Sequence, residues 1–346
     1  MVRDTSRRRR RGAMDTAALR ADLRGAIPDA TAALVITGAI VVWLYARIDN
    51  GESATLDVMP YLADADAYLL YWLCQAFGWS ALLWAWLTTM FGLLRSGRPP
   101  GWLPVSPARL ERLHRTTSLT TVALMFLHAA LFFAEMVRTG DSDTLLGRVW
   151  RAFVESFVPG GYDSGTGRVA ILLGLLAFYL AIPLGLAYYL RTRLGAGPWR
   201  ALHRFVLVVY VLSVWHTLLY GTNVWFDGWP RTTLWLLQLP PALLLLARLL
   251  VPARPAERGG ALRGRPVALA LRIGGIVATV GVIATVVTVV LTGRDGGRTP
   301  GAEGAGLTMT QGLIWAGTVV FLAVLVAAVT AARRRAVPRE REPARR

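Results

Sequence analysis

Residues 112–128 read RLHRTTSLTTVALMFLH, and residues 199–216 read WRALHRFVLVVYVLSVWH. Each segment begins with a histidine between arginines and continues as an apolar run that ends on a second histidine. An apolar run of about 20 residues is long enough to cross the hydrocarbon of a bilayer as an α-helix. The two segments therefore predict two transmembrane helices that each carry two histidines.

Six further apolar runs of similar length accompany these two segments. The eight predicted spans cover residues 30–48, 67–94, 108–137, 168–190, 199–220, 232–251, 267–292 and 310–332. The 346-residue chain is 54% hydrophobic and only 17% charged, which is typical of a polytopic membrane protein. Since lipid cannot satisfy free backbone groups, we expect an all-α integral membrane bundle of about eight helices. Pro183, Pro240 and Pro241 fall inside spans and should kink them.

The apolar runs divide the chain into five parts. These are a basic N-terminal segment 1–29, a six-helix transmembrane domain 30–251, a linker 252–266, two additional transmembrane helices 267–332 and a basic tail 333–346. The only cysteine, Cys74, lies inside an apolar run, so neither a disulfide nor a cysteine-ligated cluster can form within the chain. The first span lacks a small-residue cleavage site, and we read it as uncleaved.

Charge alternates between successive connecting segments. Residues 1–29 hold eight arginines, 48–66 five acids and no base, 95–115 five arginines, and 191–204 four arginines and no acid. Because basic segments remain in the cytoplasm, we expect the N-terminal segment, the linker and the tail to be cytoplasmic. Segments 48–66, 138–167 and 221–231 should lie outside, and the amphipathic stretch 145–154 should lie along the membrane surface.

The formal net charge of +17 therefore reflects orientation in a bilayer. It predicts membrane lipid rather than nucleic acid as the partner of the basic segments. The chain contains no lysine and is rich in Ala, Arg, Gly and Val, as in bacteria with high-GC genomes. We expect a multi-pass protein of a bacterial plasma membrane.

The chain has four histidines, and they form two pairs that match in depth. His114 and His128 are 14 residues apart, which is about 21 Å along a helix. Because the third and fifth spans run in the same direction, His203 comes at the depth of His114, and His216 at that of His128. A step of 14 residues returns to within about 40° of the same helix face, whereas the 13-residue step from His203 to His216 misses it by about 140°. The fifth span therefore requires a local distortion.

Paired imidazoles at two depths suit two stacked haems. Imidazole is a good axial ligand for haem iron, and occupation of both axial positions favours electron transfer over oxygen binding. The absence of a C-x-x-C-H attachment motif favours non-covalent, b-type haem. A histidine in a membrane helix can also simply bond to a neighbouring helix, and proton relay is a further alternative. A zinc site lacks a Cys, Asp or Glu near either pair to complete its ligands.

Arginines flank the inner pair and could bind haem carboxylates. Arg115, Arg200 and Arg204 are the candidates, since the arginine fork suits a carboxylate. Arginines at cytoplasmic helix ends are equally expected from topology alone. Near the outer pair, Tyr220, Trp225, Trp229 and Arg231 could cap a second haem or form an interfacial aromatic belt.

These histidine spacings, with 13 and 12 intervening residues, and the segment WRALHR resemble the ferric reductase-like transmembrane domain family over residues 67–250. This family includes iron reductases, the membrane part of NADPH oxidases and the haem subunit of bacterial methionine sulfoxide repair systems. The resemblance implies that residues 30–251 form the haem-binding domain. His114 and His203 would ligate the inner haem iron, and His128 and His216 the outer haem iron. It also implies that the 12 residues between His203 and His216 are compatible with haem ligation, although these two histidines do not share one face of a regular helix.

Two features depart from full-length reductases of this family. The chain carries two extra spans after residue 260, and no G-x-G-x-x-G follows a strand pattern. We therefore expect no flavin or nicotinamide to be bound by this chain, and electrons to come from a separate flavoprotein or from quinol.

The sequence as a whole predicts transmembrane electron transfer through two bis-histidine b-type haems, from a cytoplasmic donor to an acceptor at the outer face. The acceptor would be ferric iron or oxidised methionine in a partner protein. We expect an oxidoreductase membrane subunit without its own flavin or NAD(P)H domain, and whether it is itself an enzyme stays open. The alternatives are a quinol-linked haem subunit of a periplasmic reductase system and a haem-free membrane transporter or scaffold.

Overall fold

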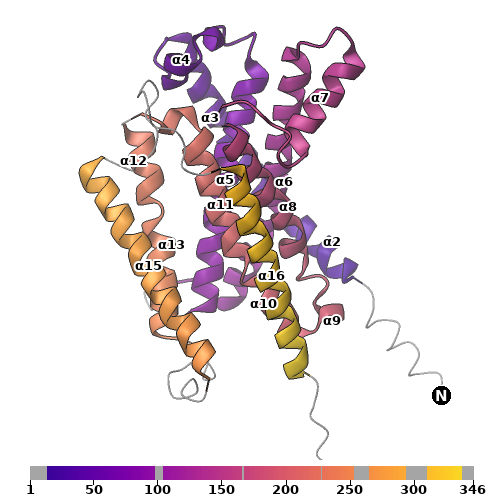
Figure 1. Cartoon of the computed structure of the whole chain (residues 1–346), viewed down its shortest axis with the longest axis vertical. Helices are drawn as coiled ribbons and strands as arrows, with labels where there is room; N and C mark the ends of the chain where they lie inside the picture. The colour runs from indigo at the N-terminus through magenta and orange to yellow at the C-terminus, as the bar shows by residue number, and fades with distance from the viewer. Residues whose placement is uncertain are drawn as a thin grey trace, which may run out of the picture.

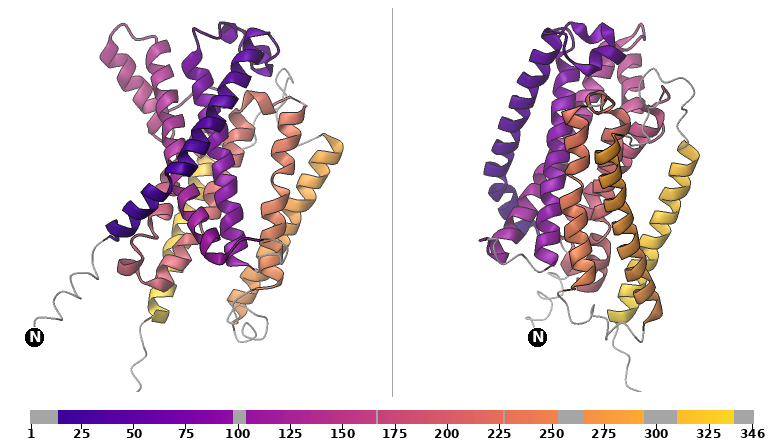
Figure 2. Two further views of the ribbon diagram at one scale, coloured as in Figure 1. Left: turned by 180° about the vertical axis from the view of Figure 1, so that it is seen from behind. Right: turned by 90° about the vertical axis from the view of Figure 1, so that its left-hand side faces the viewer.

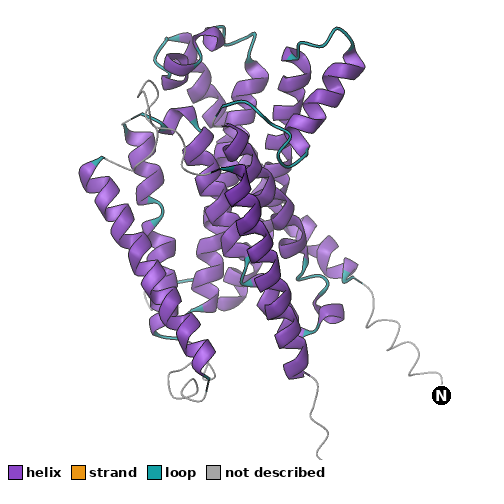
Figure 3. Cartoon of the chain, in the orientation of Figure 1, coloured by secondary structure: helices purple, strands orange, loops and turns teal. Residues whose placement is uncertain are grey.

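The computed structural model describes residues 14–97, 104–165, 167–226, 228–252, 265–293 and 310–336. In this part of the chain every regular element is a helix (Figure 3). Eight helical segments are long and apolar enough to cross a membrane. The prediction of an all-α integral membrane bundle is therefore confirmed. Arg7–Arg11, most of the linker and the end of the basic tail lie outside the described residues.

Six of the spans are single helices. They are α3 (Ile27–Asp49), α5 (Leu69–Ser96), α6 (Pro107–Thr139), α8 (Gly167–Leu186), α15 (Pro266–Thr292) and α16 (Gln311–Ala336). The other two spans are each divided, into α10 (Ala196–His203) with α11 (Val206–Tyr220), and α12 (Trp229–Leu236) with α13 (Leu239–Leu250). The described short helices are α2 (Thr16–Gly25), α4 (Ala54–Val58), η1 (Pro60–Ala63), α7 (Leu145–Phe157), α9 (Arg191–Leu194) and η2 (Thr222–Val224).

The prolines in two spans act differently from one another. Pro240 and Pro241 stand in the first turn of α13, where a missing N–H removes no helical hydrogen bond. They therefore begin a new helix instead of kinking a continuous one. Pro183 lies inside α8, which ends one turn later.

The long helices run roughly along the long axis of the molecule (Figures 1 and 2). α4 and α7 lie at one end, where the hydroxyls of Thr55 and Thr222 are 2.6 Å apart and join α4 to η2. α9, α10 and the last turns of α16 lie toward the opposite end (Figure 1). There Arg191 pairs with Asp15, just before α2, at 3.2 Å.

Two helix pairs form the centre of the bundle. α5 packs extensively against α6, and α8 packs against α11. The C-terminal helices flank this core: α15 contacts α12 and α13, and α16 contacts α10 and α8. The two additional spans therefore lie on the outside of the six preceding spans (Figure 1).

Polar side chains within the spans bond across helices. The Thr88 hydroxyl on α5 lies 2.9 Å from that of Thr117 on α6. The Asp29 carboxylate on α3 accepts hydrogen bonds from the Trp84 indole at 3.1 Å and from the Thr120 hydroxyl at 2.5 Å. Such bonds satisfy groups for which lipid offers no partner.

Helix α2 was not expected within the N-terminal segment. Its Asp22 is 8% exposed, accepts a 3.0 Å hydrogen bond from the Tyr189 hydroxyl and lies 3.5 Å from the Arg115 guanidinium. The segment that the sequence marked only as basic therefore supplies a buried acid to the core.

The predicted amphipathic stretch 145–154 lies within helix α7. Ala152 and Ser156 on one face of α7 are buried, whereas Leu146 and Trp150 are exposed. α7 packs against α6. Its position along the membrane surface stays a prediction.

Replacement of Asp29 by alanine should lower the free energy of unfolding by about 1–3 kcal/mol, because it leaves the Trp84 and Thr120 donors without their acceptor. Asp29→Asn keeps one acceptor oxygen and should cost less. Asp49→Ala, on the exposed last turn of the same helix, is the control and should stay within about 0.5 kcal/mol. Thermal unfolding in detergent measures all three; equal losses for Asp29→Ala and Asp49→Ala would refute the assigned role of Asp29.

Candidate functional site

The four histidines face one another in two pairs. His114 and His203 have ring centroids 5.7 Å apart at an interplanar angle of 79°. His128 and His216 have ring centroids 6.0 Å apart at 74°. α6 supplies one member of each pair, and α10 and α11 supply the others. The structure thus brings together the pairs that the sequence predicted; their role as ligands stays a prediction.

Three of the histidines are fixed by backbone carbonyls. The Nδ1 atom lies 2.9 Å from Thr88 O for His114, 2.8 Å from Cys74 O for His128 and 2.8 Å from Ala170 O for His216. A carbonyl oxygen can only accept, so Nδ1 carries the proton in each neutral ring. This tautomer leaves the Nε2 lone pair available as a metal ligand.

A glycine stands four residues after each of these carbonyls. An added Cβ would lie 3.0 Å from the His128 ring at Gly78, 2.9 Å from the His114 ring at Gly92 and 2.7 Å from the His216 ring at Gly174. Side chains at these positions would therefore push the imidazole away from the helix. Glycine permits the close approach that the hydrogen bond to the carbonyl requires.

His203 is held differently. Its Nδ1 atom is buried and has no hydrogen-bond partner among the described residues. The ring instead stacks on Trp199, with centroids 5.6 Å apart at 21°. Aromatic packing rather than a backbone carbonyl therefore orients this fourth histidine.

The break between α10 and α11 supplies the local distortion that the histidine spacing requires. α10 ends at His203, and α11 begins at Val206. Phe205 N bonds to Leu202 O at 3.1 Å, and Val208 N bonds to Phe205 O at 3.0 Å. These three-residue bonds are of the 3₁₀ type, which turns the chain by about 20° more per residue than an α-helix. The tighter turn brings His216 toward the face of His203.

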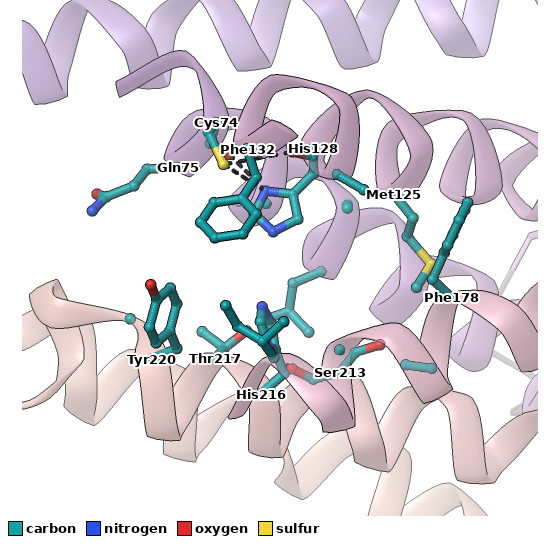
Figure 4. Close-up of a pocket in the computed structure, with 18 of the residues that line it drawn as sticks. Cys74, Gln75, Met125, His128, Phe132, Phe178, Ser213, His216, Thr217 and Tyr220 are labelled. Carbon is teal, nitrogen blue, oxygen red and sulfur yellow. Dashed lines mark hydrogen bonds between the residues drawn. The ribbon is translucent and has the colours of Figure 1, made fainter. Parts of the chain in front are cut away.

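The cavity between His128 and His216, here the outer cavity, is enclosed by α5, α6, α8 and α11, with Ser156 of α7 at its wall. Figure 4 shows the two imidazoles projecting into it from opposite sides. Tyr220 stacks on His216 with centroids 6.2 Å apart. The Cys74 Sγ lies 3.4 Å from His128 Nδ1, so the expectation that no cysteine lies near either pair is wrong for the outer pair, because α5 packs against α6 at this depth. Of the candidate caps named from the sequence, Tyr220 lines this cavity. Trp229 is exposed and packs on Trp43.

The cavity between His114 and His203, here the inner cavity, is lined by four arginines. They are Arg95, Arg200, Arg204 and Arg248. Sequence reasoning named two of them and missed the pair at the ends of α5 and α13. Each of the missed arginines lies at the end of an apolar span, and this position is the signal that could have identified both.

Arg115, the third candidate from the sequence, does not line the inner cavity. Its guanidinium donates a 2.7 Å hydrogen bond to the Tyr188 hydroxyl and lies 3.5 Å from the Asp22 carboxylate. Arg115, which directly follows His114, thereby ties α6 to α2 and to the turn after α8.

Comparison with known families gives one match to the part of the chain that holds these histidines. Residues 77–214 match the family described as "Ferric reductase like transmembrane component". The chain carries a ferric reductase-like transmembrane domain. The match includes His114, His128 and His203. It ends at Val214, two residues before His216 on α11. No curated protein and no solved structure matches the chain.

Domains of this kind carry electrons across membranes and commonly bind haem. The separations within the two imidazole pairs fit haem iron. A metal ion held about 2.0–2.1 Å from two imidazole nitrogens keeps the ring centres roughly 6 Å apart, which agrees with the observed 5.7 and 6.0 Å. Among the described residues no group of three or more His, Cys, Asp or Glu side chains could hold a bare metal ion. Haem iron needs only axial ligands from the protein, and an imidazole pair can supply them.

Gly174→Ala should displace the His216 ring, because the new Cβ would lie 2.7 Å from Nδ1. Overpacking of this kind costs about 1–3 kcal/mol of stability. Gly38→Ala is the matched control, since its Cβ meets nothing within 4 Å, and it should stabilise helix α3 by about 0.5–1 kcal/mol. Thermal unfolding in detergent compares the two variants, and a Gly174→Ala protein as stable as Gly38→Ala would contradict the close packing.

Proposed function

We propose that the chain binds two b-type haems, one in each cavity, and carries electrons across the membrane. The inner haem iron is ligated by His114 and His203, and the outer haem iron by His128 and His216. The observation that carries this proposal is the presence of two facing imidazole pairs, each at a separation that fits one iron between them. Haem iron with two imidazole ligands supplies reversible one-electron chemistry.

The protein's own residues hold and orient the ligands. The backbone carbonyls of Cys74, Thr88 and Ala170 fix the tautomer of three histidines, which presents Nε2 to the iron. Tightly packed apolar side chains such as Leu82, Leu124 and Ala177 exclude water from the region around the cavities.

Arginines of the inner cavity support binding of the haem carboxylates. Arg200 and Arg204 line the cavity, as does the pair Arg95 and Arg248 that the sequence did not reveal. A guanidinium fork binds a carboxylate through two parallel hydrogen bonds. Arg115 acts indirectly, by holding α6 against α2 through Asp22.

Purified protein should show the bands of two low-spin haems after reduction with dithionite. His216→Ala should retain one haem and lose the other, because only one axial ligand remains in the outer cavity. Added imidazole should restore part of the lost band if the variant is folded. Absorption spectra and haem-to-protein ratios provide the measurement, with Asp49→Ala as control. Wild-type protein without haem bands, or full haem content in both His114→Ala and His216→Ala, would contradict the proposal.

Both described ends of the chain are proposed to lie at the cytoplasmic face of a bacterial plasma membrane. Alternation of arginine-rich and acidic segments supports this orientation. The position of α9 and the last turns of α16 at one end of the bundle, opposite α4 and α7, agrees with it (Figure 1).

Electrons are proposed to enter at the inner cavity and leave at the outer face. The donor would be a separate flavoprotein or quinol, since reduced carriers are cytoplasmic or dissolved in the membrane. The basic surface around Arg191, Arg193, Arg200 and Arg204 could attract an acidic donor protein. The outer loops carry acids that could attract a ferric complex, namely Asp141, Asp143, Glu155, Asp163 and Asp227. Glu155 pairs with Arg151 at 2.9 Å, and Asp227 lies outside the described residues.

Proteoliposomes with reductant inside and a membrane-impermeant ferric chelate outside test this direction. The wild-type protein should accelerate reduction of the chelate, and His216→Ala should abolish most of the acceleration, because it removes a ligand of the last site. Vesicles without protein give the background rate. A rate in His216→Ala equal to that of wild type would exclude the outward path through this pair.

Orientation in the vesicles is measured with Asp57→Cys. Asp57 is exposed on the segment between α3 and α5, whereas the native Cys74 is buried. Labelling by an impermeant maleimide from outside identifies the molecules that face outward, and the reduction rate is scaled to that fraction.

A further inference from the structure

One hydroxyl on the wall of the outer cavity has no hydrogen-bond partner among the described residues. It belongs to Ser156 of α7, whose side chain is buried with 2% exposure. The other hydroxyls that line this cavity in the described part of the chain are engaged. These are Tyr71 with the Gln75 side chain, Ser213 with Val209 O at 2.9 Å, Thr217 with Ser213 O at 3.0 Å and Tyr220 with the Tyr162 hydroxyl at 3.4 Å.

The Ser156 hydroxyl does not make the bond that is usual for a helical serine. Such a hydroxyl commonly bonds to the carbonyl four residues earlier, as that of Ser213 does. A buried hydroxyl without a partner lowers stability, and buried polar groups in folded proteins are nearly always hydrogen-bonded. Ser156 therefore indicates an acceptor that belongs to a molecule bound in the cavity.

The position of Ser156 is fixed by contacts at the end of α7. Phe157 packs on Phe133 of α6 with ring centroids 5.8 Å apart. The Tyr179 hydroxyl of α8 donates a hydrogen bond to Phe157 O. Ser156 is therefore held against both α6 and α8, although it comes from the connecting segment between these two helices.

The chemistry of the cavity limits what the acceptor can be. Much of the wall is apolar, with Phe132, Ile171 and Leu175 among its side chains, and no charged residue lines it in the described part of the chain. The function proposed above places a haem here, with its iron ligated by His128 and His216. Apart from the iron, the strong hydrogen-bond acceptors of a haem are its carboxylates, and an O–H group binds a carboxylate through a short, charge-assisted hydrogen bond.

We propose that the Ser156 hydroxyl donates a hydrogen bond to a carboxylate of the haem in the outer cavity. This inference rests on the proposed function and adds a residue of the outer connecting segment to the haem site. In the inner cavity arginines are available for the carboxylates, whereas in the outer cavity neutral donors must serve. Helix α7 thereby takes part in holding the haem as well as packing against α6.

Haem release tests the inference in the His114→Ala variant, which should retain only the outer haem. Addition of Ser156→Ala should accelerate transfer of this haem to excess apomyoglobin about tenfold, because a hydrogen bond to a charged group is lost. Absorption spectra follow the transfer. The matched control is Ser80→Ala, since Ser80 is buried in α5 and accepts a 2.7 Å hydrogen bond from Thr37 but does not line the cavity. It should change the rate by less than about twofold.

Thermal unfolding in detergent separates a contact to the haem from a structural role of the hydroxyl. Ser156→Ala should lower the unfolding temperature of protein that holds the outer haem. In the His216→Ala variant, which lacks an outer ligand, the same substitution should not lower it, because the hydroxyl has no partner in the chain to lose. A decrease of equal size in both backgrounds would assign the hydroxyl to the fold and overturn the inference.

Resonance Raman spectra provide a direct readout of the haem carboxylates. Their bending mode should shift in Ser156→Ala and stay in place in Ser80→Ala. Ser156→Thr keeps a hydroxyl and should hold the mode near its wild-type frequency. If Ser156→Ala does not fold together with His114→Ala, the spectra are compared in the chain with all four histidines.

The outcomes separate the inference from the function on which it rests. Absence of haem from wild-type protein would remove both. Two haems with unchanged release and an unchanged carboxylate mode in Ser156→Ala would overturn the inference and leave the proposed function standing. Unchanged release with slower reduction of an external ferric chelate would assign the hydroxyl to the external acceptor, and this result would also overturn the inference.

Discussion

The hydrogen bond from a buried imidazole to a backbone carbonyl of the neighbouring helix is the contact on which both cavities depend. A helical carbonyl already accepts the N–H four residues later, and its second lone pair remains free for another donor. The imidazole can reach that lone pair only where the residue four positions on lacks a side chain, which is the case at Gly78, Gly92 and Gly174. This contact sets the distance between α5 and α6 and between α8 and α11.

Fixing one nitrogen of each ring also determines what the other can do. Because Nδ1 donates to the helix, Nε2 must face away from it and into the space between the helix pairs. The bilayer strengthens this arrangement, since lipid offers no competing acceptor. Because lipid offers no hydrogen-bond partners, the hydroxyls of α5 and α6 also bond to one another, and Asp29 accepts hydrogen bonds from Trp84 and Thr120.

Much of this architecture could be predicted from the sequence, because bilayer thickness fixes the length of a span. The pairing of His114 with His203 followed from depth alone. The 13-residue step from His203 to His216 indicated that the fifth span is distorted. It did not show where, because the turn after His203 depends on how α10 packs. The spacing of 14 residues between Gly78 and Gly92 equals that between His114 and His128, and this match was a signal that sequence reasoning did not use.

Other features depend on contacts that no local pattern encodes. Arg95 and Arg248 are more than 150 positions apart and reach one cavity only because α13 packs against α5. Helix α2 lies in a segment whose arginines dominate its composition. Its buried Asp22 could be recognised only once Arg115 and Tyr189 were seen beside it.

The division of the fifth span gives the C-terminal helix a mechanical role. α10 has only eight residues and is separated from α11 by the turn at Arg204 and Phe205, so it cannot rely on a continuous helix for rigidity. α16 packs along it: Phe321 contacts Phe205 edge to face at 5.4 Å, and Ala332 O would lie 3.5 Å from a Cβ at Gly197. α16 thus acts as a splint for the short helix that carries His203. A helix outside the six-span core therefore stabilises the position of one of the four histidines, His203.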